Sequence, residues 1–441
     1  MGSTVFKGGV HPDYNKEITA TMAVSPMKPP SKVVIPLQQH IGAPCEPLEG
    51  IEVGSEVKRG QKIADSTGFV SAPIHSSVSG KILAIGPYNH PLGSVLPAIT
   101  IEPDGEDRWD ESIKPGGDME NLSAADIRNI VREAGIVGMG GATFPAHVKL
   151  TPPAEKPIDV VVINGAECEP YLTADHRVML EQPEEIVFGL KAIMKVLNAD
   201  KAVIGIEDNK ADAIRVLEKA IEGEENISIA HLHTKYPQGA EKMLIQVTTG
   251  RVVPAGGLPM DVGVVNFNVG TAIAINDAIR EGKPLTERVV TVTGSGINRP
   301  ANLLVRVGTL VSEVIEACGG MKESTMKLIV GGPMMGKAQV NDDIPVIKGT
   351  SGILALTDQD MYLAESSPCI RCAKCLDGCP MFLSPTGIAQ FAEFEKYGDA
   401  EKLHAMDCFE CGCCSYVCPS KIPLTQWIRI AKAEITKAKK K

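Results

Sequence analysis

The sequence predicts a multi-domain protein of mixed α/β and α+β class, and three observations support this prediction. The chain has 441 residues, which suggests about three domains at roughly 150 residues each. Short strand-like runs dominate its beginning, strands alternate with helices in its middle, and cysteines crowd its end. We expect a β domain at 1–115, an α/β domain at 116–287, a small β-grasp module at 288–350 and a helical domain at 351–441.

The composition excludes several classes of protein. Hydrophobic residues make up 44% of the chain and charged residues 22%, which is typical of folded globular proteins and excludes a disordered one. No apolar run approaches the ~18 residues that a bilayer-spanning helix needs. The formal net charge of −10 argues against non-specific binding to nucleic acid. The N-terminus lacks the basic flank and apolar stretch of an export signal, so we expect the protein to stay in the cytosol unless a partner holds it elsewhere.

The first region is rich in glycine, proline and short strand-like runs such as 32–36. Within it, residues 54–63 and 72–82 resemble the two halves of a biotinyl/lipoyl-type barrel sandwich. Carrier domains of that type present a modified lysine at the tip of the second half, where this chain has Ser77-Val78-Ser79. We therefore expect a scaffold and not a swinging carrier arm.

The middle of the chain predicts a parallel sheet. Ser123 suits a helix N-cap with Asp126 at the third helical position, and Gly135 suits the stop of the same helix. Strand-like runs at 158–163 and 201–206 flank a helical stretch at 183–196, and this βαβ rhythm is typical of a parallel sheet. The alternation of strands and one helix over 288–332 suits a β-grasp module.

The cysteines carry the strongest chemical signal. Nine of the twelve lie in the last 73 residues, and in a reducing compartment such crowding points to metal ligation. Cys369-x-x-Cys372-x-x-Cys375-x-x-x-Cys379-Pro380 repeats 39 residues later as Cys408-x-x-Cys411-x-x-Cys414-x-x-x-Cys418-Pro419. This doubled motif is the signature of a protein with two [4Fe–4S] clusters, in which the fourth cysteine of each run ligates the other cluster.

The motif thus predicts one cluster on Cys369, Cys372, Cys375 and Cys418, and a second on Cys408, Cys411, Cys414 and Cys379. Zinc is the alternative, although zinc sites usually pair two Cys-x-x-Cys knuckles across a longer gap. We expect Cys413 to be no ligand. Because such clusters transfer single electrons, the C-terminal region is predicted to conduct electrons between two stations.

Two loops are candidates for a nucleotide site. Gly138, Gly140 and Gly141 precede Phe144-Pro145, and Lys149 lies one turn into the helix that Pro145 opens. Exposed backbone amides of such a loop can bind phosphate, although an ordinary turn is the alternative. The second loop is 164–170, which contains Asn164, Glu167 and Glu169 directly after a predicted strand. Loops in that position hold ligands in parallel sheets, and a solvated acidic turn is the alternative.

These residues resemble the flavin- and NADH-binding subunit of respiratory complex I. That family's Gly-Arg-Gly-Gly-Ala-Gly-Phe-Pro-Thr-Gly-Leu-Lys is similar to 138–149, its Asn-Ala-Asp-Glu-Ser-Glu-Pro to 164–170, its Tyr-x-x-Gly-Glu-Glu to 236–241 and its Asn-Val-Glu-Thr to 268–271. The resemblance implies non-covalent FMN held by Lys149, Asn164 and Asn268. It also implies a nicotinamide pocket for NAD(H) bordered by Phe144, Glu169, Tyr236 and Glu241, with Glu167 and Gly239 completing the cofactor site.

The chain departs from that family at four loop positions, which are Met139, Thr143, Ala166 and Ala240 in place of Arg, Gly, Asp and Glu. An adenine-stacking aromatic is also replaced near Pro152. The complex I family carries one cluster, whereas this chain carries the doubled motif. These departures bear on nucleotide affinity more than on the fold.

The whole arrangement resembles the C subunit of the Rnf complex, including its opening Phe6-Lys7-Gly8-Gly9-Val10-His11-Pro12 and a β-grasp module of the SLBB type. The resemblance implies an NAD-linked oxidoreductase subunit, peripheral on the cytoplasmic face of a membrane complex. That complex passes electrons between ferredoxin and NAD, coupled to Na+ or H+ translocation by partner subunits. We expect those subunits as partners, especially an iron–sulfur B-type subunit, with ferredoxin reached indirectly and no nucleic acid.

Two other functions stay open at this point. A soluble flavin/iron–sulfur reductase, such as the cobalamin reductase of propanediol-using microcompartments, has a similar set of modules but no membrane partner. An electron-wiring adaptor without a working nucleotide site is the second, motivated by Ala166 and Ala240. Retention of flavin and reduction by NADH distinguish the adaptor from the other two.

Overall fold

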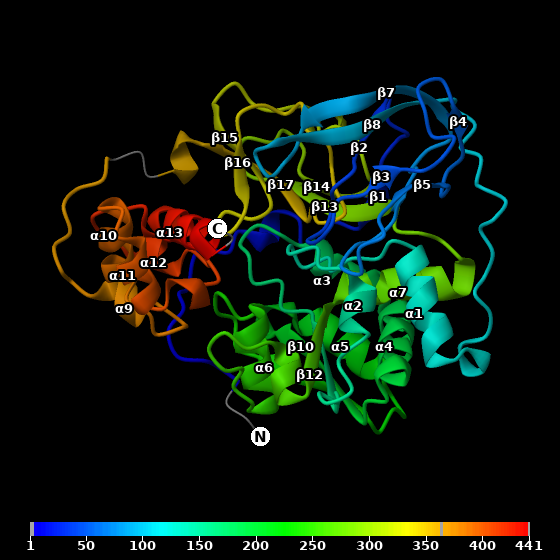
Figure 1. Ribbon diagram of the computed structural model, residues 1–441. Coiled ribbons are helices and arrows are strands. Elements are labelled where there is room, and N and C mark those ends of the chain that lie inside the picture. The colour runs from blue at the N-terminus through cyan, green and yellow to red at the C-terminus, as the bar shows by residue number, and fades with distance from the viewer. Residues whose placement is uncertain (1–3, 362–364, 440–441) are drawn as a thin grey trace.

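The computed structural model describes residues 4–361 and 365–439 of the chain. In this part of the chain the strands form sheets of six, four, four and three strands. The α/β region occupies one end, the two β regions lie above it, and the C-terminal helices pack at the side (Figure 1). No described helix has the length and apolar character to cross a bilayer.

The N-terminal β domain consists of two small sheets facing each other. The four-stranded sheet has the order β2-β8-β7-β4, and the three-stranded sheet has the order β3-β5-β6. Their bounds are β2 Val33–Pro36, β3 Glu46–Pro47, β4 Glu56–Val57, β5 Lys62–Asp65, β6 Ile74–His75, β7 Gly80–Asn89 and β8 Val95–Pro103. Residues such as Ile35, Ile63 and Ile99 are completely buried between them, as a barrel sandwich requires.

The tip that carrier domains expose is buried here. Ser76 and Ser77 have no exposed surface, and Val78 and Ser79 are 1% exposed. The Ser77 hydroxyl donates to the carbonyl of Val307 at 2.6 Å, so the tip is locked against the neighbouring β module. The expected scaffold role of this domain follows from that contact.

The central domain is a four-stranded parallel sheet with the order β11-β10-β9-β12. Its strands are β9 Val160–Asn164, β10 Lys201–Glu207, β11 Ile227–Leu232 and β12 Val264–Asn268. Its helices are α1 Ala124–Glu133, α2 Ala146–Lys149, α3 Ala174–Glu181, α4 Pro183–Leu197, α5 Ala211–Ala220, α6 Glu241–Thr249 and α7 Val269–Glu281. Short 3-10 turns are η1 Lys16–Ile18, η2 Met119–Asn121, η3 Asp208–Lys210 and η4 Pro259–Val262.

Side-chain alternation along these strands decides which helices cover each face. Val161 and Ile163 of β9 pack with α4 and α7, whereas Val160 and Val162 pack with α6. At the start of the domain, Ser123 and Asp126 form the predicted capping box on α1. The register places Asn164 beside Asn268 where both strands end.

The β-grasp module is larger than the sequence suggests. Its six-stranded sheet has the order β1-β14-β13-β17-β15-β16, with β1 Val24–Pro26, β13 Glu287–Thr293, β14 Ala301–Arg306, β15 Thr325–Val330, β16 Lys337–Gln339 and β17 Gly352–Thr357, and helix α8 Val311–Ala317. The predicted boundaries miss β1 and β17. The run 352–357 is fully buried between β13 and β15, so the C-terminal domain begins after it and not at 351.

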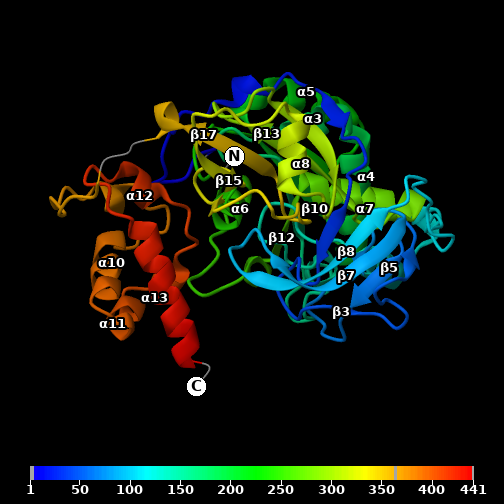
Figure 2. The same cartoon turned by 90° about the horizontal axis from the view of Figure 1, so that it is seen from above.

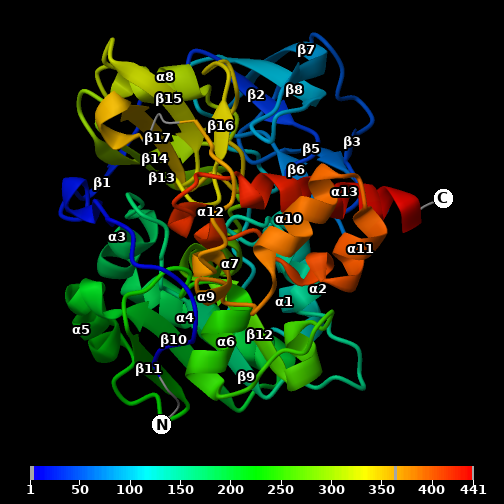
Figure 3. The same ribbon diagram turned by 90° about the vertical axis from the view of Figure 1, so that its left-hand side faces the viewer.

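The C-terminal domain is helical, as expected. It contains η5 Asp358–Asp360 at its start and then α9 Lys374–Asp377, α10 Pro385–Glu393, α11 Tyr397–Lys402, η6 Ala405–Asp407, α12 Cys413–Val417 and α13 Leu424–Lys439. Ile388, Ala400 and Ile428 form its small core. Seen from above, these helices form a separate lobe at one side of the molecule (Figure 2), and in the side view they lie in front of the other domains (Figure 3).

Candidate functional site

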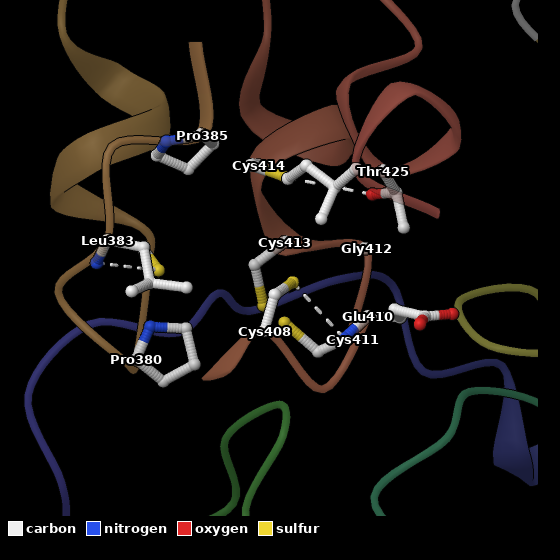
Figure 4. Close-up of a pocket in the computed structure, with 12 residues that line it drawn as sticks. Pro380, Leu383, Pro385, Cys408, Glu410, Cys411, Gly412, Cys413, Cys414 and Thr425 are labelled. Atoms are coloured by element: carbon white, nitrogen blue, oxygen red, sulfur yellow. Dashed lines mark hydrogen bonds between the residues drawn. The ribbon is translucent and has the colours of Figure 1, made fainter. Parts of the chain in front are cut away.

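The cysteines of the C-terminal lobe surround two cavities, and the fourth cysteine of each motif lies in the other motif's cavity. One cavity is lined by Cys369, Cys372, Cys375 and Cys418. The other is lined by Cys379, Cys408, Cys411 and Cys414, with Cys413 also at its wall. Figure 4 shows four of these side chains gathered around the second cavity. We refer to these cavities as the outer and the inner cavity, respectively.

The donor set fits a cluster of several metal atoms. The four thiols of each set line a cavity, and nowhere in residues 4–361 or 365–439 do three Cys, His, Asp or Glu side chains converge closely enough to hold one metal ion. Backbone N–H groups point at the sulfurs, from Arg371 to Cys369, from Leu383 to Cys379 and from Glu410 to Cys408, each at 3.4 Å. Such hydrogen bonds stabilise cluster-bound thiolates and tune their potential.

Burial acts on the thiols of the inner cavity. It raises the pKa of Cys408 to about 12 and the pKa of Cys414 to about 11. The Cys408 and Cys414 thiols therefore keep their protons at neutral pH, and metal binding must release them, whereas a hydrogen bond with Cys413 lowers the pKa of Cys411. Loading of this cavity is accordingly expected to become easier as the pH rises.

The two cavities differ in exposure. Cys369 and Cys372 of the outer cavity are exposed, while Cys379, Cys411 and Cys414 of the inner cavity are buried. The inner loop packs on Val10, Cys168 and Tyr236 of the α/β side. A side chain at Gly412 would meet the Met334 carbonyl at 2.9 Å. The inner cavity therefore faces the rest of the protein, and the outer cavity faces solvent.

The glycine loop of the α/β domain forms a tight, open cradle. Its ends are joined by the Val137–Pro145 bridge and by the Gly138 N–H, which donates to the Phe144 carbonyl at 2.8 Å. Gly141 has φ +108° and no atom within 4 Å of where a Cβ would lie. Thr143 has a left-handed φ of +50°, a conformation that glycine adopts readily. For a threonine it costs local backbone strain.

Three asparagines lie beside this cradle, Asn164 and Asn268 at the ends of their strands and Asn266 in the middle of β12. Asn266 and Asn268 of β12 and Asn164 of β9 share the face covered by α6, because side chains alternate along a strand. The place where a Cβ of Gly140 would lie is 3.7 Å from Asn268 Cβ. The Asn266 amide nitrogen is buried and has no hydrogen-bond partner among the described residues.

Lys149 lies beside the same asparagines. Its Nζ donates to the Asn266 carbonyl at 2.9 Å and pairs with Glu241 at 3.0 Å. Its side chain is 26% exposed, so the ammonium can still meet a ligand. An open glycine cradle, an amine and an unpartnered buried amide together fit an anionic nucleotide such as FMN.

Each region of the chain has a counterpart among known proteins. Family models match successive residues, described as the RnfC Barrel sandwich hybrid domain at 4–106, the Nuo51 FMN-binding domain at 131–277, the SLBB domain at 289–338 and the 4Fe-4S dicluster domain at 368–422. The C subunit of the proton-translocating ferredoxin:NAD(+) oxidoreductase complex of Clostridium ljungdahlii is 53% identical, over 97% of this chain and 93% of the relative. The chain belongs to the RnfC family.

Other RnfC relatives agree over the same length. The C subunit of the Na(+)-translocating ferredoxin:NAD(+) oxidoreductase complex of Acetobacterium woodii is 50% identical over 99% of this chain and 98% of the relative. The C subunit of the ion-translocating oxidoreductase complex of Rhodobacter capsulatus is 43% identical over 99% and 84%. The predicted four-part architecture and the expected FMN and [4Fe–4S] domains are thereby confirmed.

Among solved structures, an NAD+-reducing [NiFe]-hydrogenase in the H2-reduced state is similar in fold. The TM-score is 0.50 at 18% identity, over 73% of this chain and 65% of that one. At this identity the likeness concerns the fold alone.

Not all expected nucleotide residues of this RnfC chain meet at the cradle. Gly239 does lie at the end of β9, with its Cβ position 3.4 Å from Asn164 Oδ1, and Phe144 closes the glycine loop. Glu167 instead caps α3, because its carboxylate accepts from the N–H groups of Asp175 at 2.7 Å and His176 at 3.2 Å. This acidic side chain serves the fold and does not line the cradle.

Glu169 and Tyr236 make hydrogen bonds to backbone groups of other modules. The Glu169 carboxylate accepts from the N–H groups of Met334 at 3.1 Å and Met335 at 2.8 Å. The Tyr236 hydroxyl donates to the Cys411 carbonyl at 2.7 Å. Both side chains thus join the α/β domain to neighbouring modules, which differs from the pocket-bordering role that the complex I resemblance implies.

Several residues that support the cradle escaped the sequence analysis. Arg288 of β13 is buried and lies with both terminal nitrogens 3.4 Å from the Met139 carbonyl, underneath the glycine loop. Asp175 of α3 accepts from the Asn268 amide at 2.6 Å. Burial and the nearby Glu167 carboxylate raise the pKa of Asp175. No local signal marks these two, whereas a polar Asn266 in an otherwise apolar strand was a signal that could have been used.

Proposed function

We propose that this chain is the electron-transfer subunit of a membrane-bound Rnf complex. It would pass electrons between NAD(H) and partner subunits through FMN and two [4Fe–4S] clusters. Ion translocation, of Na+ or H+, would be performed by the partners. The observation that carries the proposal is the position of the two cysteine cavities, one enclosed against the flavin-binding domain and one open to solvent.

The difference in exposure between the two cavities supports an order in which electrons pass through the two clusters. Cys411 of the inner cavity contacts Tyr236, which is only three residues before Gly239 at the cradle. The inner cluster is therefore the one we assign next to the flavin. The outer cluster, on Cys369, Cys372, Cys375 and Cys418, is then the station that exchanges electrons with a partner.

The chain's own residues bind and orient the groups and supply no acid or base. Lys149, the glycine loop and the strand-end asparagines are assigned to the flavin. FMN held there would supply the exchange between the electron pair of a nicotinamide and the single electrons that iron–sulfur clusters carry. The role of the protein is to hold these groups close together and to shield them from water.

The exposed rim of the outer cavity supports an electron partner there. Ile370, between the first two cysteines, is 67% exposed, and Arg371 also lines the opening. An iron–sulfur B-type subunit is the partner we propose, with ferredoxin reached indirectly. A peripheral position on the cytoplasmic face of the membrane follows from the same proposal.

The decisive experiment is an anaerobic titration of the isolated chain with NADH, with FMN supplied and visible absorbance recorded. We expect both the flavin and the iron–sulfur bands to bleach. Bleaching by dithionite but not by NADH would contradict the proposal and favour the adaptor function. Full NADH activity without co-purification of membrane subunits from the native host would favour a soluble reductase.

A further inference from the structure

The first described residues of the chain run between the α/β domain and the C-terminal lobe (Figures 1 and 3). Val10 forms an antiparallel bridge with Tyr236: the Val10 N–H donates to the Tyr236 carbonyl at 2.8 Å, and the Tyr236 N–H donates to the Val10 carbonyl at 3.0 Å. The N–H of Gly9 donates to the Gly378 carbonyl at 3.0 Å. Gly9 and Val10 therefore connect the backbone of the α/β domain, at Tyr236, to the backbone of the C-terminal lobe, at Gly378.

The two glycines of this segment have no room for a side chain. Gly8 has φ +78°, and a Cβ there would lie 2.8 Å from the Cys379 carbonyl oxygen. Gly9 has φ +77°, and its Cβ would lie 2.5 Å from the Tyr236 carbonyl oxygen. Both neighbours are backbone atoms, which cannot rotate away as a side chain can, and both conformations already disfavour other residues.

Phe6 anchors the segment on the α/β side. Its ring is 4% exposed and packs with residues of β9, β12 and α6. Lys235 donates to the Phe6 carbonyl at 3.2 Å, and its ammonium lies 5.0 Å from the centre of the Phe6 ring. Lys235 lies directly before Tyr236 in sequence, so Phe6 and Val10 grip the same loop.

The segment reaches the inner cavity at two points. Gly8 and Gly9 touch the backbone at Gly378 and Cys379, and Cys379 lines that cavity. Val10 holds Tyr236, which is fully buried and donates to the Cys411 carbonyl. Two of the four cysteines assigned to the inner cluster are therefore held, directly or through Tyr236, by these residues.

We propose that residues 6–10 form a strap that positions the inner cluster loops against the flavin-binding domain. Gly8, Gly9 and Tyr236 are positioning residues in this scheme, since none of them is assigned as a ligand of the cluster. The strap sets the distance across which electrons pass between the two domains. The prediction about the electron-transfer rate rests on the proposed function. The prediction about the attachment of the cluster loops rests on geometry alone.

The first test compares Gly9→Ala with Gly93→Ala in the full, anaerobically loaded chain. Gly93 also has a positive φ, +87°, but no atom lies within 4 Å of its Cβ position, so it matches the backbone strain without the clash. In Gly9→Ala we expect faster hydrogen–deuterium exchange over residues 376–382, with unchanged iron content. We also expect flavin-to-cluster transfer slowed by about 10- to 100-fold in stopped flow, with NADH-to-flavin reduction unchanged.

The second test removes the strap and returns it as a peptide. A chain lacking residues 1–10 should bind a fluorescent synthetic peptide of residues 1–12, measured by anisotropy, and the peptide should restore both exchange protection and transfer rate. A peptide with Gly8 and Gly9 replaced by alanine should do neither. This test also covers the case in which Gly9→Ala fails to fold.

The outcomes separate this inference from the proposed function. The strap proposal is wrong if Gly9→Ala shows the hydrogen–deuterium exchange and the flavin-to-cluster transfer rate of the wild type. It is also wrong if the two peptides behave alike. If NADH fails to reduce the wild-type chain, the proposed function fails, while exchange protection and peptide binding still decide the strap.

Discussion

The hydroxyl of Tyr236 provides a direct measure of how firmly the two domains are joined at the inner cavity. In Tyr236→Phe the ring keeps its packing against Val10, Cys168 and Cys413, whereas the hydrogen bond of the hydroxyl to the Cys411 carbonyl and its interaction with the Glu169 carboxylate are lost. Removing the donor from a buried carbonyl costs about 1–3 kcal/mol. Local opening of the 408–414 loop should therefore become roughly 5- to 150-fold more frequent.

Hydrogen–deuterium exchange of the loaded protein measures this opening directly. Amides of residues 405–415 should exchange faster in Tyr236→Phe by the same factor. Tyr416→Phe is the matched control, because Tyr416 is 46% exposed and its substitution should change stability by less than about 0.5 kcal/mol. Equal exchange in the wild type and in Tyr236→Phe would refute the reasoning, as would an equal effect of both substitutions.

Three further predictions address the clusters, the flavin and a buried lysine. Cys411→Ser should lower the iron content by about half, whereas Cys413→Ser should keep it; equal losses would contradict the ligand assignment. Lys149→Ala should weaken FMN binding about 5- to 150-fold in calorimetry, while Lys156→Ala, which removes a surface ion pair with Asp261, should not. Burial lowers the pKa of Lys348 from 10.5 to about 8. Between pH 8 and 10.5 the unfolded chain therefore binds more protons than the folded protein. The free energy of unfolding then rises with pH over this range, by at most about 3 kcal/mol. Thermal unfolding midpoints of Lys348→Met should rise less over this range, because Lys16 has the same lowered pKa and remains, and a parallel profile in both proteins would show that Lys348 is not a source of the rise.

Much of the fold follows from local patterns. The capping box of Ser123 and Asp126, the βαβ rhythm around β9 and β10, and the short strand-like runs of the first region are properties of short segments. Local rules describe such segments well because hydrogen bonds and side-chain periodicity act within a few residues. Two strands of the β-grasp sheet were missed. The edge strand β1 comes from a distant part of the chain, and the central strand β17 begins just beyond the predicted boundary and pairs with β13 and β15.

For the candidate site, too, some residues could be predicted from the sequence and others could not. Glycines, Lys149, Asn164 and Asn268 were predicted from their spacing and from family resemblance, and they lie near one another at one cradle. Glu167, Glu169 and Tyr236 matched the same motifs, yet their side chains bind neighbouring backbone groups. A motif specifies residue types along the chain, but the direction of a side chain depends on which domain packs against it.

The sequence by itself determined the chemistry of this protein, because each cysteine motif encodes three closely spaced ligands of one cluster and the fourth ligand of the other. Only the tertiary structure decided which cluster faces the flavin-binding domain and which faces solvent. That order depends on contacts such as Tyr236 with Cys411, 175 residues apart, and on a strap from the beginning of the chain. Contacts of this kind leave no periodic signal, since they arise when separately folded domains pack together.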